Sequence, residues 1–350
     1  MIEEKADIKS MTLQELEERL KTQGMPSFRA KQIFQWLHEK QVDSFEEMTN
    51  LSKELRVQMA REYELVVLKT EAVEISKIDG TRKYLFGLPD GHVIESVLMK
   101  YRHGNSVCIS SQVGCRMGCR FCASTIDGLE RNLRPSEMLD QVYRIQKDLG
   151  ERISHVVVMG SGEPFDNYSN LVSFIQLITY EKGMNISQRN ITVSTCGLVP
   201  EIEQFAEEGL SVTLALSLHA PNDEVRKTLM PVANRYALKD ILKACHTYFK
   251  KTGRRVTFEY SLVRGVNDQP QEAEALVRLL KNQGAHVNLI PVNPIKERDY
   301  VQPSQKAAET FKQVLEKNGI NVTIRREMGR DINGACGQLR KRFVEAQKGR

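Results

Sequence analysis

Three cysteines within eight residues are the part of this sequence whose types and spacing most directly imply chemistry. Cys115, Cys119 and Cys122 form a C-x3-C-x2-C pattern, with Phe121 directly before the last cysteine. Three thiolates this close together can each bind one iron of a [4Fe–4S] cluster, which leaves the fourth iron open to a small molecule. The alternative is a structural zinc site, but zinc usually takes four ligands in paired spacings, and no second pair lies nearby. A disulfide framework is disfavoured because the chain has seven cysteines, an odd number.

Short apolar segments that alternate with longer helical stretches would position this triplet. They predict strands at Val107–Ile109, Val156–Met159, Ile191–Ser194, Val212–Ser217, Val256–Tyr260 and Val287–Ile290, with Val322–Ile324 as a candidate seventh. Repeated β-α units of this kind indicate an α/β fold with a parallel sheet, here a partial (β/α)6 barrel. The triplet follows the first strand, at the edge where such barrels carry their chemistry.

Motifs with polar residues come directly after several of these strands, at the same edge. They contain Gly162, Glu163, Ser194, Ser217, Leu218, His219 and Asn293. Singly each motif is weak, because a serine at a strand end is usually a turn residue and a lone histidine is usually structural. Glu163 stands in a glycine turn, where a carboxylate can take an ammonium group. Together with the cysteines, these residues predict a ligand pocket.

The first part of the chain has a different character. Residues 1–70 predict a helical accessory domain, and Thr12 with Glu15 makes the capping-box pattern of a helix start. Residues 71–103 predict a short antiparallel β segment, because turn residues separate two apolar runs. Residues 104–350 then form the barrel, with a C-terminal active-site loop and a basic tail.

Charge and composition limit the classes to which this protein can belong. The chain has 350 residues, 41% of them hydrophobic, and a net charge of +5. It has no apolar run long enough to span a membrane, and its polar, acidic start is not the pattern of a secretory signal. With seven cysteines and no disulfide pattern, we expect a reduced, cytoplasmic protein. Residues 325–350 hold eight Lys or Arg and three Asp or Glu, which suits a phosphate-bearing substrate, although a solvated tail is the alternative.

Several ordered motifs resemble those of one known family. They are Ser110–Ser124, Met159–Pro164, Ser217–Ala220, Leu229–Val232, Gly265–Asp268 and Ala335–Leu339. Together they resemble the RlmN/Cfr family of radical S-adenosylmethionine (SAM) methyltransferases, which modify adenine in RNA. The stretches Phe28–Gln32 and Ser111–Cys115 favour the RlmN branch. The resemblance implies a radical SAM barrel with one [4Fe–4S] cluster on the three cysteines and SAM at the open iron.

The same resemblance implies roles for individual residues. The reaction would methylate carbon 2 of a specific adenosine in 23S rRNA and in tRNA, with two SAM molecules per turnover. Cys336 would carry the methyl group, Cys108 would release the product by forming a disulfide with Cys336, and Glu95 would accept the proton. The SAM contacts would be Gly162, Glu163, Ser194, Ser217, Leu218, His219 and Asn293. The implied partners are these RNAs, which the helical accessory domain and the basic tail would contact, and a flavodoxin-like or ferredoxin-like electron donor. We expect a monomer without membrane contact.

Three other functions stay open at this point. A Cfr-like enzyme would use the same cysteines at carbon 8 of adenine and confer antibiotic resistance. A non-catalytic iron–sulfur RNA-binding regulator would need neither Glu163 nor the pair Cys108 and Cys336. A radical SAM enzyme that modifies peptides usually carries further cluster cysteines near its C-terminus, and only Cys336 stands there. Cys196 departs from the family pattern, and its role is open.

Overall fold

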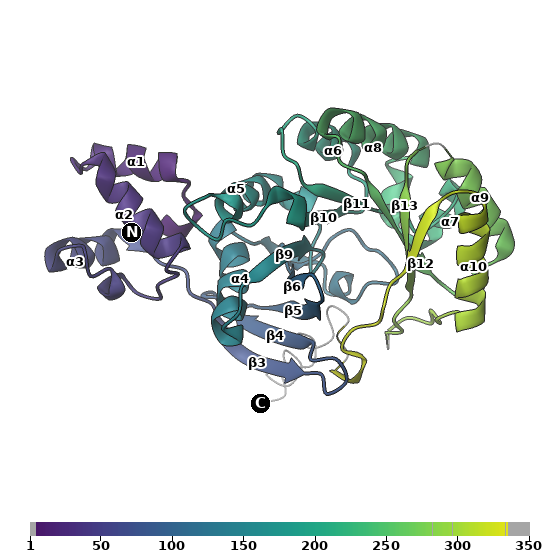
Figure 1. Cartoon of the computed structure of the whole chain (residues 1–350), viewed down its shortest axis with the longest axis horizontal. Coiled ribbons are helices and arrows are strands. Elements are labelled where there is room, and N and C mark those ends of the chain that lie inside the picture. The colour runs from purple at the N-terminus through teal and green to yellow at the C-terminus, as the bar shows by residue number, and fades with distance from the viewer. Residues whose placement is uncertain (1–4, 282, 296, 333, 335–350) are drawn as a thin grey trace.

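One long sheet forms the centre of the molecule. The computed structural model describes residues 5–281, 283–295, 297–332 and 334, and within these ranges ten strands pair in the order β14-β13-β12-β11-β10-β9-β6-β5-β4-β3 (Figure 1). The strands from β6 to β14 pair in parallel. Their bounds are β6 Gly104–Ile109, β9 Ile153–Val158, β10 Ile191–Thr195, β11 Thr213–Ser217, β12 Thr257–Leu262, β13 His286–Pro291 and β14 Asn321–Ile324. Each predicted strand segment, the candidate seventh included, is confirmed.

The antiparallel segment is part of this sheet. Strands β3 (Lys69–Ile75), β4 (Arg82–Gly87) and β5 (Val93–Tyr101) pair in sequence, and β5 then pairs with β6. The predicted antiparallel strands are confirmed, and they extend the barrel sheet at its first edge. Two short pairs complete the strands of the described chain: β1 Ala6–Asp7 with β2 Tyr63–Glu64, and β7 Gln112–Gly114 with β8 Leu129–Asn132.

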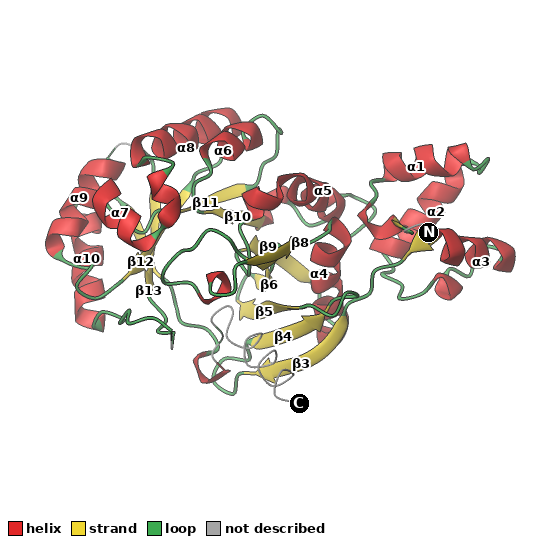
Figure 2. Ribbon diagram, turned by 180° about the vertical axis from the view of Figure 1, so that it is seen from behind, coloured by secondary structure: helices red, strands yellow, loops and turns green. Residues whose placement is uncertain are grey.

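Helices cover the outer face of the parallel strands (Figures 1 and 2). They are α4 Pro135–Leu149, α5 Tyr168–Thr179, α6 Val199–Phe205, α7 Asp223–Leu229, α8 Leu238–Thr252, α9 Pro270–Leu280 and α10 Gln305–Lys317. Alternating residues of a strand face opposite sides. In β10, Ile191 and Val193 are fully buried in the main core, whereas Ser194, the next residue, faces the other side and lines a cavity. The alternation therefore places apolar side chains on the face that packs against the helices and polar side chains on the face that lines the cavity.

The N-terminal helices form a group at one side of the barrel (Figure 2). They are α1 Leu13–Thr22, α2 Ser27–His38 and α3 Lys53–Glu62, and the predicted capping box of Thr12 and Glu15 is present at the start of α1. Buried polar contacts join this group to α4: Lys9 pairs with Asp140 at 2.7 Å, and His38 lies 2.9 Å from the hydroxyl of Tyr143. The domain boundaries at 70 and 103 stay predictions.

In the part of the chain that the structure describes, no helix is both long enough and apolar enough to cross a membrane.

Candidate active site

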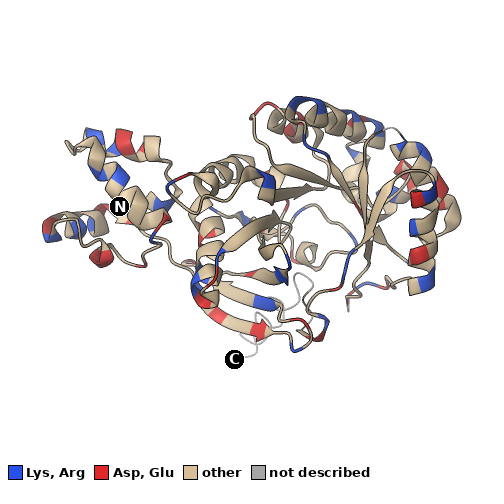
Figure 3. Ribbon diagram, in the orientation of Figure 1, with Lys and Arg blue, Asp and Glu red and all other residues tan. Residues whose placement is uncertain are grey.

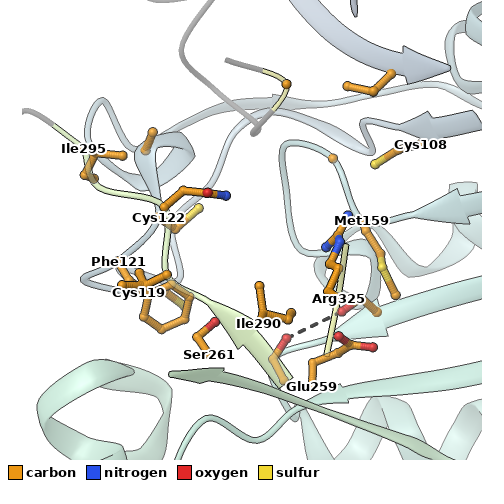
Figure 4. A pocket seen from close by; sticks show the side chains of 18 of the residues that line it. Cys108, Cys119, Phe121, Cys122, Met159, Glu259, Ser261, Ile290, Ile295 and Arg325 are labelled. Atoms are coloured by element: carbon orange, nitrogen blue, oxygen red, sulfur yellow. Dashed lines mark hydrogen bonds between the residues drawn. The ribbon is translucent and has the colours of Figure 1, made fainter. Parts of the chain in front are cut away.

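A cavity of about 510 Å3 lies at the carboxyl ends of the parallel strands (Figure 4). Its size is in the range of small-molecule sites. The predicted site residues that line it are Glu95, Cys108, Cys115, Cys119, Cys122, Gly162, Glu163, Ser194, Ser217, His219 and Asn293. Leu218 instead packs its side chain in the main core. Cys336 and the tail that follows it lie outside the described residues.

The cysteine loop is held between two strands and a neighbouring helix end. The pair β7 and β8 brackets the loop, and the Cys115 amide donates to the Gly128 carbonyl at 2.8 Å. Gly114 has φ +76, and a Cβ there would lie 2.0 Å from that same carbonyl oxygen. The Arg120 amide donates to the Leu229 carbonyl, at the end of α7. These contacts hold the backbone of the loop in place, and the three thiols lie on the cavity wall.

The three thiols fit an iron–sulfur cluster better than a zinc ion. Burial, together with nearby thiolate charge, raises the pKa of Cys115 to about 12 and that of Cys119 well above its usual range. Thiolates at these positions would need a positively charged group to bind them. Each cysteine of a [4Fe–4S] cluster binds a different iron, so three cysteines are enough for it, whereas a structural zinc ion usually takes four protein ligands.

Glu163 is a buried carboxylate that backbone amides orient. Its two oxygens accept hydrogen bonds from the amides of Phe165 at 3.1 Å and Cys196 at 2.8 Å. Burial raises the pKa of Glu163, and these hydrogen bonds oppose the rise. A desolvated carboxylate on a cavity wall gains most from a cationic partner. Cys196, whose role the sequence left open, supplies one of the amides that hold it.

His219 is held as a neutral imidazole. Its Nδ1 accepts a hydrogen bond from the Ser261 amide at 2.8 Å, so Nε2 carries the ring proton. Burial, with the charge of Arg226, lowers the pKa of His219 to about 3. The ring meets that of Phe121 edge-on at 4.7 Å between centroids. Nearby, the hydroxyls of Ser194 and Ser217 lie 3.5 Å apart. This part of the wall offers neutral hydrogen-bonding groups to a ligand.

Glu95 and Cys108 stand on adjacent antiparallel strands. Cys108 pairs with Val97, two residues after Glu95, so both side chains reach the cavity. Lys83 forms a buried ion pair with Glu95 at 3.0 Å. Burial raises the pKa of Cys108, and the charge of Arg325 opposes the rise. Figure 4 shows Cys108 across the cavity from Cys119 and Cys122.

Sequence reasoning missed several residues of the cavity wall. Glu259, Ser261 and Arg325 line it, and the Glu259 carboxylate accepts a hydrogen bond from Asn288 at 2.8 Å. Burial raises the pKa of Glu259. A charged residue inside the apolar strand Val256–Tyr260 was the signal available for it.

Arg226 was also not identified from the sequence, and it lies behind the cavity wall. It is completely buried and donates to the carbonyls of Cys196 at 2.6 Å, Leu218 at 3.1 Å and Ser217 at 3.2 Å. It thereby joins the turns that follow β10 and β11. Sequence gives no signal for this role, because an arginine in the short helix α7 looks like a surface residue.

Comparison with known proteins agrees with this geometry. The model of the radical SAM superfamily matches residues 109–280, and the model of the ribosomal RNA large subunit methyltransferase N-terminal domain matches residues 6–65. A protein of Lachnoclostridium phytofermentans described as "Probable dual-specificity RNA methyltransferase RlmN" is 64% identical, over 98% of this chain and 97% of its own. One of Clostridium novyi with the same description is 52% identical, over 97% and 98%.

A solved structure is similar over nearly the whole chain. A radical SAM methyltransferase from Sphaerobacter thermophilus superimposes with a TM-score of 0.91 at 44% identity, and the match covers 95% of this chain and 98% of that one. The fold of the described chain is thus shared with that methyltransferase. The chain belongs to the RlmN family of methyltransferases within the radical SAM superfamily.

Proposed function

We propose that this chain methylates carbon 2 of a specific adenosine in 23S rRNA and in tRNA, with Cys336 as the methyl carrier and Cys108 as the resolving cysteine. The observation that carries the proposal is the arrangement of a single cavity. Cys115, Cys119 and Cys122 line one wall, and Cys108 lies across from Cys119 and Cys122 (Figure 4). A substrate bound between these walls can meet both sets of thiols.

The roles of the cofactors follow from the residues that would hold them. Cys115, Cys119 and Cys122 would hold one [4Fe–4S] cluster, and SAM bound beside it would supply the methyl group and the radical chemistry. Glu163 is oriented to bind the ammonium group of SAM. Ser194, Ser217, His219 and Asn293 offer neutral polar groups for the rest of that molecule. Gly162 has φ +111, and its lack of a side chain lets the turn lie against Gln112.

On the opposite wall, the chain's own residues would handle protons and sulfur. Glu95, which forms a buried ion pair with Lys83, would accept the proton lost from the substrate carbon. The Cys108 thiolate would attack the sulfur of Cys336, which forms a disulfide and releases the carbon held on that sulfur. An external reductant would then restore both thiols. A low-potential electron-transfer protein of the flavodoxin or ferredoxin kind would serve the cluster.

An RNA substrate agrees with the charge near the cavity. Arg325, Arg326 and Arg330 are among the residues that line it, and their charges can neutralise phosphates. Lys and Arg also stand on the N-terminal helices (Figure 3). An enzyme that modifies a base must take it out of the stack, and RNA loops allow this at low cost. The RlmN description of the relatives favours carbon 2 over the Cfr-like alternative. A non-catalytic regulator would need neither Glu163 nor Cys108, and both of these line the cavity.

Two cysteine variants test the proposal, because they should fail differently. Cys336→Ala should form neither product nor a covalent RNA adduct, since the carrier is missing. Cys108→Ala should accumulate enzyme joined to RNA, seen as a denaturation-resistant band that ribonuclease removes. Cys245→Ala is the matched control: this buried thiol lies in α8, and its loss should leave turnover intact. Nucleoside mass spectrometry would identify the methylated carbon, and clean turnover by Cys108→Ala would rule out the two-cysteine scheme.

A further inference from the structure

The segment after β14 runs from one edge of the long sheet to the other. β14 and β3 are the two edge strands, so the sheet does not close on itself. Residues 325–332, which we call the strap, leave β14 and reach the turn between β3 and β4 (Figures 1 and 2). Residues 76–81 make up this turn, which we call the anchor turn. The strap thus bridges the side that the strands leave open.

The strap and the anchor turn each contain a carboxylate that accepts hydrogen bonds from the other segment. Asp331 of the strap accepts hydrogen bonds from the Ser76 hydroxyl at 2.6 Å and from the Lys77 amide at 2.8 Å. Asp79 of the anchor turn accepts one from the Gly329 amide at 3.0 Å. Hydrogen bonds to an ionised acceptor are stronger than neutral ones. Three such bonds within a few residues make a specific clamp.

The anchor turn also has hydrogen bonds within itself. The Asp79 carboxylate accepts from the Thr81 amide at 3.0 Å, and the Ser76 hydroxyl accepts from the amides of Ile78 at 3.1 Å and Asp79 at 3.3 Å. Partial burial acts to raise the pKa of Asp79, but hydrogen bonds from Gly329 and Thr81 outweigh it and bring the pKa to about 2. The Ser76 hydrogen bond likewise lowers the pKa of Asp331. Both carboxylates are therefore charged at neutral pH.

Gly329 brings the strap backbone directly onto the anchor turn. Its φ is +62, and a Cβ would lie 3.0 Å from Cγ2 of Thr81 and 3.1 Å from Cγ1 of Ile332. A side chain here would strain the backbone and push the strap away from the turn. The close approach agrees with the hydrogen bonds and indicates that this contact is tightly specified.

The clamped strap is part of the cavity wall. Arg325, Arg326, Met328 and Arg330 of the strap line the cavity. Cys336 follows Asp331 by five residues, which can span at most about 18 Å when fully extended. The position of Asp331 therefore limits how far from the cavity the cysteine can go.

We propose that Asp79, Ser76 and Asp331 are positioning residues that fix the strap across the cavity and so deliver Cys336 to its reaction partners. This inference rests on the proposed role of Cys336 as methyl carrier. The three residues act through the strap, and none of them lines the cavity wall as described.

The test is Asp331→Ala in the full-length, cluster-reconstituted protein, with two measurements. Trypsin cleavage after Arg325 and Arg326 reports whether the strap is held, and it does not depend on any activity. The bond after Arg330 is not used, because the substitution changes the residue that follows it. It should become roughly tenfold faster or more, because the variant loses two hydrogen bonds to a charged acceptor. RNA methylation and methyl occupancy of Cys336 should fall by a similar factor, while the KM for SAM and the iron content stay unchanged.

Three further variants separate positioning from a general loss of stability. Asp331→Asn keeps one side-chain oxygen that can accept from the Lys77 amide, and it should recover part of the lost rate. Asp79→Ala removes the other half of the clamp and should reproduce the effects of Asp331→Ala. Glu151→Ala is the matched control: it also loses two hydrogen bonds, from Lys100 at 3.1 Å and Asn105 at 3.0 Å, at a site away from the strap. It should leave both measurements unchanged.

The outcomes distinguish this inference from the proposed function. Unchanged trypsin cleavage in Asp331→Ala would overturn the clamp. Faster cleavage with unchanged methylation of RNA would overturn the positioning role. If the wild-type protein never carries a methyl group on Cys336, the proposed function fails, and that result comes from the wild type alone, whereas the proteolysis still reports on the clamp.

Discussion

Single residues of this site are oriented mainly by backbone groups of neighbouring strand ends. Amides of Phe165 and Cys196 fix the Glu163 carboxylate, and the Ser261 amide fixes the tautomer of His219. Arg226 joins the turns that supply these residues from behind. Side chains held in this way lose little freedom when a ligand binds, so the cavity is organised before SAM arrives.

Glu163→Ala should weaken SAM binding and leave the cluster in place. The variant removes the only partner we assign to the SAM ammonium group, and loss of one member of a desolvated charge pair typically costs about 2–5 kcal/mol. The dissociation constant for SAM should therefore rise by a factor of about 30 or more. Equilibrium binding to the reconstituted protein measures it, with iron content as the internal check.

The control for this prediction is Glu208→Ala. Glu208 is exposed and bonds to the hydroxyl of Tyr168 at 2.8 Å, outside the cavity wall. Its loss should not change the affinity for SAM. Equal affinities in wild type and Glu163→Ala would show that Glu163 binds no ligand charge and only orders its turn.

Among the elements, the turn after β9 depends on close backbone contact. A Cβ on Gly160 would lie 2.6 Å from the carbonyl oxygen of Ile109, at the end of β6, and 2.8 Å from the Ser110 amide nitrogen. These neighbours are backbone atoms of the adjacent parallel strand, so they cannot move aside at low cost. The turn that carries Glu163 thus lies directly against the start of the cysteine segment.

Gly160→Ala should consequently lower both stability and SAM affinity. Overpacking of a tight contact costs about 1–3 kcal/mol, and here the displaced element is the turn that carries Glu163. Gly150→Ala is the matched control: Gly150 ends α4 with φ +69 and has nothing within 4 Å of its Cβ position. It should lower the melting temperature alone. If Gly160→Ala binds SAM as tightly as Gly150→Ala does, the contact does not set the position of the turn.

Most elements could be predicted from local pattern, and their pairing could not. The parallel strands were predictable because each is an apolar run between helical stretches. The sheet continues from β6 into β5 through a short turn at Arg102 and His103, where the composition of the chain changes. Composition reports on local surroundings, whereas strand pairing depends on backbone hydrogen bonds that every residue can make. The pairing of the antiparallel strands with the parallel strands could therefore not be predicted from the sequence.

For the candidate site, sequence predicted residues that stand in short motifs and missed those that act across the fold. Glu163 and the cysteines are recognisable from their immediate neighbours. Arg226 and the clamp between Asp79 and Asp331 connect segments far apart in the chain, the latter 252 residues apart. Their side-chain types are ordinary for surface positions. Only the fold shows that Arg226 is buried and that Asp331 has partners in a distant turn.

At the scale of the whole molecule, buried polar groups hold the N-terminal helices against the barrel. Lys9 of the N-terminal segment pairs with Asp140 of α4, and both side chains are almost completely buried. His38, at the end of α2, contacts Tyr143 of α4, and its Nε2 has no hydrogen-bond partner among the described residues. Removing one partner of such a contact while the junction stays closed leaves a buried polar group unpaired, so substitutions here should be destabilising.

Acid should weaken this junction through His38. Burial, with the charge of Lys9, lowers the pKa of His38 from 6.5 to about 3. Between these values the unfolded chain binds a proton at this residue and the folded chain does not, so the free energy of unfolding falls as the pH falls below 6.5. One such group contributes a slope of up to about 1.4 kcal/mol per pH unit. His219 is buried in the same way and adds to the wild-type slope.

His38→Asn should remove the contribution of His38 and leave that of His219. An amide can keep a hydrogen bond to Tyr143 but does not titrate, so the variant should lose less stability than the wild type between pH 6.5 and pH 5. Urea unfolding at several pH values, followed by the fluorescence of Trp36 in α2, measures the difference. His246→Asn, at an exposed position of α8, is the matched control and should keep the wild-type slope. Parallel slopes for wild type and His38→Asn would mean that His38 takes up a proton while buried, and the acid sensitivity of the molecule would then have to come from groups outside this junction.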